Sequence, residues 1–417
     1  MKTKGFSYLF NLRNRGSSYG IDRMQRLVPL LSNPHKSFPV VHVAGTNGKG
    51  SVCAMLDSIY RENGYKVGLF SSPHLVELGE RIMVDGKPLT NRKIEHLINI
   101  IRPVADELEE KVPGEGPTFF EFMTIMAFLV FKEQKVDLAI FETGLGGRLD
   151  STNVCQPELT LITTIDRDHC AILGNTIEEI AKEKAGIIKE RVPVLCGWLP
   201  DEANEVIRRY AASRSAPFES LALNENPYLP ETNLFGEYQR RNASMAYRAV
   251  QILNENFPVS KPRVLNGLKK VKLEGRWQII EVKPRLILDA CHNREGALAL
   301  RSNLIQLDQT VVVWMGALGE ERARDVLQAV CPFATEIRFF RPNQSRACSF
   351  ETLKKMIPTE FSGSVNEGSV DSLLDHMKET DKSSTVLITG SIYLIGEILA
   401  IFKNSNGPMG ANFQDLV

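Results

Sequence analysis

A glycine-rich segment with one lysine and one hydroxyl group lies near the start of the chain. Residues 40–43 are Val-Val-His-Val and residues 45–51 are Gly-Thr-Asn-Gly-Lys-Gly-Ser, before a predicted helix over 52–63. At such a strand-to-helix turn, backbone N–H groups and the helix dipole converge on an anion. Lys49 is placed to reach the outer phosphates of a nucleotide, and the Ser51 hydroxyl to bind Mg²⁺. The segment therefore predicts a site for ATP or a similar nucleotide.

The spacing within this phosphate-loop candidate departs from the generic pattern G-x-x-x-x-G-K-[ST]. Gly45 stands three positions before Gly48, and Gly50 separates the lysine from the serine. An ordinary glycine turn between a strand and a helix is the alternative interpretation. The flanking strand and helix, together with the Lys–Gly–Ser order, favour phosphate binding by Asn47 and the four residues after it.

A second glycine-rich segment follows the predicted strand 136–141. It begins at Glu142, ends at Asp150 and carries Arg148 between them. Mg²⁺ prefers hard oxygen ligands, so a carboxylate beside a phosphate loop commonly holds this ion. A surface ion pair between Glu142 and Arg148 is the alternative. The position of Glu142 at a strand end near the phosphate loop favours Mg²⁺ binding.

Other titratable residues also follow predicted strands. Asp168 and His169 come after one strand, where the histidine is either an ordinary satisfied side chain or a metal or nucleotide ligand. Asp289 and His292 come after another, with a turn cap and an exposed histidine as the alternative. Lys184 lies late in a predicted helix whose charged face is typical of solvent exposure, and nothing in its spacing singles it out.

Short β-branched runs alternate with longer helical stretches along the chain. This alternation predicts an α/β fold with a mostly parallel sheet covered on both faces. Ligands of such sheets gather at the carboxyl ends of the strands, where the polar clusters lie. The predicted strands are 40–43, 66–70, 136–141, 159–165, 193–196, 286–288, 310–315, 336–340 and 385–389, and the predicted helices include 52–63, 120–132, 177–188 and 235–254.

The length of 417 residues exceeds one comfortable hydrophobic core, so two domains are expected. Residues 213–235 are polar and punctuated by proline, which indicates an irregular insertion. The first strand of the second series is expected at residue 286. We therefore predict a nucleotide-binding domain of phosphate-loop ATPase type over 1–275, and a smaller Rossmann-like α/β domain over 276–417.

Composition and charge exclude several classes of function. The 50 basic and 50 acidic residues balance, which argues against a broad surface for nucleic acid or acidic lipid. The seven cysteines form no C-x-x-C pair, which favours reduced thiols in the cytosol. Residues 1–14 lack the apolar core of a signal peptide, and residues 386–402 predict a strand and a helix rather than a membrane span. We expect a cytoplasmic protein with no nucleic-acid or membrane partner.

Together these segments resemble the Mur ligase superfamily, and within it the folylpolyglutamate synthase/dihydrofolate synthase family. The resemblance covers nearly the whole chain, and the order and combination of the segments are specific. The Lys49-Gly50-Ser51 order separates this family from the cell-wall Mur ligases, in which the hydroxyl residue usually follows the lysine directly. The matching segments are residues 19–24, 42–51, 71–75, 79–82, 118–122, 142–153, 168–169 with 173–174, 183–189, 242–243, 274–276, 289–293 and 390–396.

The resemblance implies roles for particular residues. ATP would be bound by Asn47, Gly48, Lys49, Gly50, Ser51, Asn242, Arg276, Asp289 and His292, and Mg²⁺ by Ser51, Ser72, Glu142 and His169. Lys49, Lys184 and His169 are the catalytic candidates; Lys184 matches a lysine that is carbamylated in this family, which makes it an anion able to help position Mg²⁺. A pterin pocket would be lined by Gly16, Ser17, Ser18, Tyr19, Thr118, Phe119, Phe120, Glu121, Leu149 and Asp150.

Four positions depart from the family pattern without removing a proposed ligand. Residues 289–293 are Asp-Ala-Cys-His-Asn where Asp-Gly-Ala-His-Asn is more usual. Thr143 stands where valine is common, and Tyr238 where histidine is frequent.

The implied reaction is ATP-dependent, ADP-forming amide ligation with Mg²⁺ as cofactor. A substrate carboxylate attacks the γ-phosphate, and the amine of L-glutamate then attacks the resulting acyl phosphate. The acceptor would be dihydropteroate, a reduced folylpolyglutamate or both, and a monomeric, bifunctional enzyme is expected. A folylpolyglutamate synthase alone is the alternative.

Three other functions compete with this expectation. A Mur-type ligase for another carboxylate, such as a cell-wall precursor, is disfavoured because the phosphate loop starts too early to leave room for a uridine-nucleotide-binding domain before it. A phosphotransferase would stop at phosphate transfer and need no amino acid. A non-catalytic nucleotide-binding regulator is disfavoured because Lys49, Ser51, Glu142 and His169 are all present.

Overall fold

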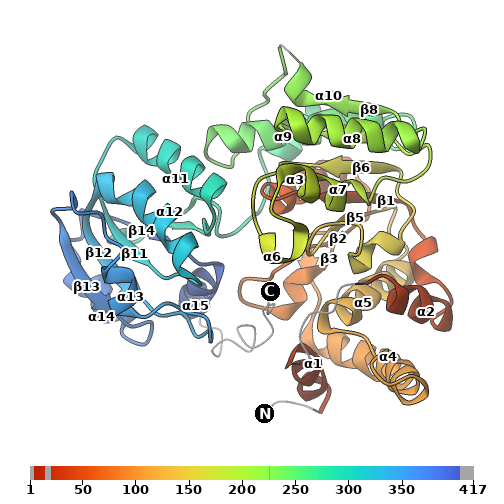
Figure 1. Cartoon of the computed structure of the whole chain (residues 1–417), viewed down its shortest axis with the longest axis horizontal. Helices are drawn as coiled ribbons and strands as arrows, with labels where there is room; N and C mark the ends of the chain where they lie inside the picture. Colours follow the sequence, from red (N-terminus) through yellow and green to blue (C-terminus); the bar gives the residue numbers. More distant parts are fainter. Residues whose placement is uncertain (1–3, 15–19, 225, 404–417) are drawn as a thin grey trace.

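Two largely parallel sheets organise the chain, and helices cover both faces of each (Figure 1). The computed structural model describes residues 4–14, 20–224 and 226–403. The predicted α/β class is therefore confirmed. Within these ranges, none of the helices combines the length and the apolar character needed to cross a bilayer.

The first sheet has eight strands and is parallel except at one edge, where β3 pairs antiparallel with both of its neighbours. In spatial order the strands are β4 (Lys87–Pro88), β3 (Ile82–Val84), β2 (Val67–Phe70), β5 (Leu138–Glu142), β1 (Val40–Ala44), β6 (Leu159–Ile162), β7 (Val194–Cys196) and β8 (Phe218–Ser220). Strand β1 is central, with β5 and β6 parallel on its two sides. The carboxyl ends of these three strands therefore meet at one edge.

Helices bury the two faces of this sheet in separate cores. One face is covered by α1 (Lys4–Asn14), α2 (Asp22–Leu30), α4 (Asn91–Lys111), α5 (Phe119–Gln134), α7 (Ile177–Ala185) and α8 (Asp201–Ser213). The other is covered by α3 (Lys49–Glu62), α9 (Glu237–Ile252) and α10 (Lys261–Leu268). Short segments complete the unit: α6 (Cys170–Leu173), η1 (Pro34–Lys36), η2 (Leu78–Arg81), η3 (Ser151–Val154) and η4 (Leu221–Leu223).

The second sheet has six strands and lies in the left half of Figure 1. Its order is β13 (Ser364–Gly368), β12 (Ala334–Phe340), β11 (Val311–Met315), β14 (Thr385–Thr389), β10 (Arg285–Asp289) and β9 (Gln278–Ile280). One face packs against α11 (Arg294–Leu307), α12 (Glu320–Val330) and α13 (Phe350–Lys354), with η5 (Cys331–Phe333). The other packs against α14 (Leu373–Glu379) and α15 (Ile392–Phe402).

Several predicted elements differ from the structure at the edges of the sheets. The stretch 213–235 is not wholly irregular, because it contributes the edge strand β8. The strand at 286 is not the first of its series, because β9 precedes it and pairs with β10 antiparallel. The proposed domains, 1–275 and 276–417, divide the chain between α10 and β9, in the segment that separates the two sheets.

Candidate functional site

The phosphate-loop candidate joins the central strand β1 to helix α3. The helix begins at Lys49, so the prediction that it starts at residue 52 is wrong. Gly48 precedes it with a φ of +82°, and its carbonyl already accepts the N–H of Val52 at 2.9 Å. Lys49 and Ser51 therefore lie in the first helical turn, whose N–H groups lack helical partners and favour an anion.

Alanine at position 48 is expected to weaken ATP binding. A Cβ on Gly48 would lie 2.7 Å from Asn242 Oδ1, and its φ of +82° disfavours any side chain. A side chain in this left-handed conformation costs about 1–2 kcal/mol. Relief of that strain would shift the loop that binds the phosphates, so we expect the KM for ATP to rise about tenfold or more.

Gly64→Ala is the matched control for this substitution. Gly64 has a φ of +91°, no atom lies within 4 Å of the place that a Cβ would take there, and the residue follows the far end of α3. Alanine at position 64 therefore causes a backbone strain similar to that at position 48, but it makes no close contact with a residue of the site. Steady-state kinetics for ATP distinguish the two variants, and equal KM values would contradict the role of the Gly48 turn.

Two lysine side chains meet the carbonyl oxygens at the base of this loop. Lys49 Nζ donates to Gly45 O at 3.0 Å and to Thr46 O at 3.1 Å, while Lys184 Nζ donates to Gly45 O at 2.8 Å. Lys184 is 3% exposed, so its interpretation as part of a solvated helix face is wrong. Burial, reinforced by the charge of Lys49, lowers the pKa of Lys184 from 10.5 to about 7.

The carboxylate of Glu142 lies over the first turn of α3, at the end of β5. A Cβ on Gly50 would be 3.7 Å from Glu142 Oε2. The N–H of Ser72 donates to the same oxygen at 3.3 Å. Arg148 pairs instead with Glu183, at 2.8 Å, so the alternative of a Glu142–Arg148 ion pair is wrong. Burial raises the pKa of Glu142, and a nearby cation would favour its ionised form.

His169 stands in the turn between β6 and α6, with a φ of +50°. Its N–H donates to Asp168 Oδ1 at 2.9 Å, which fixes the turn. Burial lowers the pKa of His169 to about 4, so the imidazole is neutral at physiological pH. A neutral imidazole keeps the lone pair that a metal ion requires.

The second sheet supplies the opposite side of the site. Asp289, the last residue of β10, accepts the N–H groups of Trp277 and Cys291 at 3.0 Å each. Burial raises its pKa to about 6, and the charge of Arg276 opposes that rise. His292 Nδ1 lies 2.9 Å from Ala290 O. Two backbone N–H groups therefore hold the Asp289 carboxylate in place, and the nearby positive charge of Arg276 favours its ionised form.

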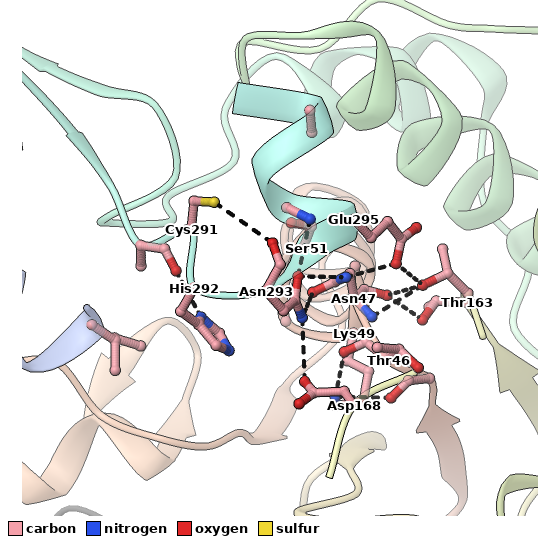
Figure 2. A pocket seen from close by; sticks show the side chains of 18 of the residues that line it. Thr46, Asn47, Lys49, Ser51, Thr163, Asp168, Cys291, His292, Asn293 and Glu295 are labelled. Atoms are coloured by element: carbon pink, nitrogen blue, oxygen red, sulfur yellow. Dashed lines mark hydrogen bonds between the residues drawn. The ribbon is translucent and has the colours of Figure 1, made fainter. Parts of the chain in front are cut away.

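One cavity, of about 360 Å³, brings the predicted nucleotide and metal residues together. In Figure 2, Asn293 lies between His292 and Asn47, and dashed lines join Asn293 to Asn47. The predicted residues that line it are Asn47, Gly48, Lys49, Gly50, Ser51, Ser72, Glu142, His169, Lys184, Asn242, Arg276, Asp289 and His292. The carboxyl ends of strands from both sheets thus converge on one site.

Comparison with known proteins assigns the chain to a family. The Mur ligase middle domain matches residues 43–246. The dihydrofolate synthase/folylpolyglutamate synthase of Bacillus subtilis is 38% identical over 411 residues, which cover 92% of this chain and 95% of that protein. This chain belongs to the same family of Mur ligases. It is therefore a ligase, as the resemblance implied.

Solved structures of the family share the whole fold. Folylpolyglutamate synthase from Thermotoga maritima superposes with a TM-score of 0.84 at 30% identity, covering 98% of each chain. E. coli FolC, in complex with DHPP and ADP, superposes with a TM-score of 0.82 at 29% identity, covering 96% of this chain and 97% of that one. The two-sheet architecture is thus that of the folate ligases.

Of the residues predicted for a pterin pocket, those that the structure describes do not line the nucleotide cavity. Thr118 and Glu121 cap the start of α5, and Glu121 also pairs with Arg23 at 3.0 Å. The buried carboxylate of Asp150 accepts the N–H groups of Gly144, Leu145 and Thr152 and the Thr152 hydroxyl. These bonds fix the positions of both carboxylates, and their role in a pterin pocket stays a prediction. The remaining positions are Phe119, which is buried, Phe120 and Leu149, which are partly exposed, and Gly16, Ser17, Ser18 and Tyr19, which fall outside the described residues.

Phe120 nevertheless connects the predicted pterin segment to the cavity. A Cβ on Gly144 would lie 2.5 Å from the Phe120 ring, and Gly144 itself lines the cavity. The ring therefore packs directly behind the glycine-rich segment that starts at Glu142.

Sequence reasoning missed several residues of the site. Thr163 Oγ1 donates to Asn47 O at 2.6 Å, and the N–H of Asn47 donates to Thr164 Oγ1 at 3.0 Å. Both threonines follow β6, which ends at Ile162, but the predicted strand ran to residue 165, so the strand-end rule pointed beyond them. Ser391, which follows the predicted strand 385–389, carried the strand-end signal. Other lining residues carried none, because only the packing of the second unit brings them to the cavity; these are Glu295, Arg322 and Arg346.

Proposed function

We propose that the protein joins L-glutamate to dihydropteroate, to reduced folylpolyglutamates, or to both, with cleavage of ATP to ADP and phosphate. The observation that carries this proposal is the convergence of Lys49, Glu142, His169 and Asp289, from two sheets, on one cavity. The relatives named for both activities, and the E. coli FolC complex with DHPP and ADP, support it.

Lys49 and the first turn of α3 perform the first step. The free N–H groups of this turn bind the nucleotide phosphates, and the Lys49 ammonium neutralises the charge that develops on the γ-phosphoryl group. The acceptor carboxylate attacks phosphorus, ADP leaves, and an acyl phosphate forms. The glutamate amine then attacks the acyl carbon and phosphate leaves, giving the amide.

The donor set fits Mg²⁺. Ser51, Ser72, Glu142 and His169 all line the cavity, and the buried Glu142 carboxylate gains from a cation beside it. In the described part of the chain, no three His, Cys, Asp or Glu side chains gather as a metal site. Mg²⁺ usually keeps several waters and takes one or two carboxylates. One carboxylate, that of Glu142, together with the other three side chains is therefore enough to hold the ion. When bound, it supplies positive charge at the transferred phosphoryl group.

Lys184 is proposed to carry a carbamate. Carbamylation requires the neutral amine, and a pKa of about 7 leaves a large neutral fraction at physiological pH. The modified side chain would place an anion beside the phosphate loop, where its amine now contacts Gly45 O. That anion would help to orient Mg²⁺ at the nucleotide phosphates.

We further propose a cytoplasmic monomer. All seven cysteines are free thiols, which supports a reducing compartment. The predicted nucleotide and metal residues all line one cavity within a single chain, which supports a monomer.

The deciding experiment measures phosphate release from ATP with Mg²⁺ and L-glutamate, with 7,8-dihydropteroate or tetrahydrofolate as acceptor. We expect glutamate-dependent turnover with both acceptors. Turnover with one alone assigns a single activity, as in the folylpolyglutamate synthase alternative. No glutamate-dependent turnover with either acceptor rejects the folate assignment in favour of a ligase for another carboxylate.

A further inference from the structure

Direct hydrogen bonds join the two α/β units at the phosphate loop (Figure 2). Asn47 Nδ2 donates to Asn293 Oδ1 at 3.2 Å, and Asn293 Nδ2 donates to Asn47 Oδ1 at 3.1 Å. Asn47 Nδ2 also donates to Glu295 Oε2 at 2.6 Å, and Thr164 Oγ1 donates to the same oxygen at 3.0 Å. The start of α11 therefore holds both the phosphate loop and the end of β6.

A second group of contacts reaches the turn that carries His169. Arg322, on α12, donates from Nη2 to Asp168 Oδ1 at 2.7 Å, and Asn293 Nδ2 donates to Asp168 Oδ2 at 3.2 Å. Asp168 Oδ1 also accepts the N–H of His169. The Asp168 and Arg322 side chains are 13% and 30% exposed, so water screens this ion pair only partly.

We propose that Asn293, Glu295 and Arg322 form an interdomain clasp that positions the phosphate loop and the Asp168–His169 turn for ligation. The three side chains bond to protein groups of the first unit, so we assign them as positioning residues. They belong to the second unit, while their partners Asn47 and Asp168 belong to the first. The clasp therefore forms only when the two units are closed upon each other.

The consequence of the clasp rests on the proposed function, because it concerns the acyl phosphate. Closure excludes water from such an intermediate. In a loosened enzyme, a water oxygen attacks the acyl carbon, the bond from that carbon to the phosphate oxygen breaks, and phosphate leaves. The acceptor carboxylate and a proton are regenerated, so ATP is consumed without an amide product.

Two substitutions loosen the clasp without removing a proposed ligand. Asn293→Ser keeps a side-chain oxygen for the α11 cap, where Asn293 Oδ1 accepts the N–H of Gly296 at 2.9 Å, but removes the amide donors. Arg322→Ala removes the ion pair with Asp168. Arg324→Ala is the matched control, because Arg324 lies on the same helix and is exposed.

We expect both clasp variants to release more phosphate than amide, at a ratio above about two, whereas the wild type and Arg324→Ala stay near one. The KM for ATP should rise about tenfold, as for loss of a charge-assisted hydrogen bond. A purely structural role would lower activity but leave the phosphate-to-amide ratio at one.

Amide hydrogen exchange of residues 45–51 and 168–169 provides a readout that needs no substrate. Faster exchange in Asn293→Ser and Arg322→Ala than in Arg324→Ala supports the clasp. Unchanged exchange, or faster exchange with an unchanged phosphate-to-amide ratio, overturns it. If the wild type shows no glutamate-dependent turnover, the proposed function fails, and the exchange result still decides whether the clasp holds the loop.

Discussion

Replacing Lys49 with alanine is expected to abolish ligation while leaving the fold intact. Lys49 stands in the first turn of α3, and its ammonium is held at the loop by the carbonyls of Gly45 and Thr46. Without it, charge developing on the transferred phosphoryl group loses the cation of the phosphate loop. We expect kcat to fall by about 10³-fold, equivalent to about 4 kcal/mol, because stabilisation of this charge is the main catalytic task.

Phosphate release at saturating ATP, glutamate and acceptor measures this loss. Lys87→Ala is the control, because Lys87 is exposed on the edge strand β4, away from the cavity. Circular dichroism and the melting temperature should match the wild type in both variants. Near-normal turnover in Lys49→Ala would reject the assignment of this loop.

Activity is also expected to depend on dissolved CO2 through Lys184. Burial lowers the pKa of this amine to about 7, so about half of it is neutral at pH 7, whereas an exposed lysine is almost wholly charged. The neutral amine is the form that binds CO2. As the pH falls through 7, the amine is protonated and the carbamate is lost, so the rate in CO2-depleted buffer should fall between pH 8 and 6 and recover with bicarbonate.

Lys184→Met separates this effect from a general pH dependence. We expect its kcat to fall about 100-fold, or about 2.7 kcal/mol, with no response to bicarbonate. Lys182→Met is the control, because Lys182 is exposed on the same helix. Carbon-13 NMR with labelled bicarbonate should detect a carbamate in the wild type and in the control. Wild-type activity in Lys184→Met would exclude a catalytic carbamate.

Buried parallel strands were predictable because both of their faces are covered. Strands β1, β5, β6 and β14 are buried at every residue, so each is mostly apolar along its length. Strands β9 and β13 are only partly buried and carry polar residues, and neither was predicted. A strand at a sheet edge needs little apolar surface, so its identity depends on a neighbour rather than on its own sequence.

The sequence by itself determined the central strands and the loops that follow them. Glu142, His169 and Asp289 were predicted because parallel strands end at a common edge, where ligands gather. The types of these residues, and the glycines beside Lys49, follow from the needs of phosphate and Mg²⁺.

Only the tertiary structure decided which charged side chains are buried and which meet across the two sheets. Lys184 stands among charged neighbours along its helix, and its burial under the loop at Gly45 follows from the packing of α7 against the first sheet. Arg322 is separated from Asp168 by 154 positions, and no local pattern links them. Burial and long-range pairing are properties of packed surfaces, whereas strand and loop propensities are properties of short segments of chain.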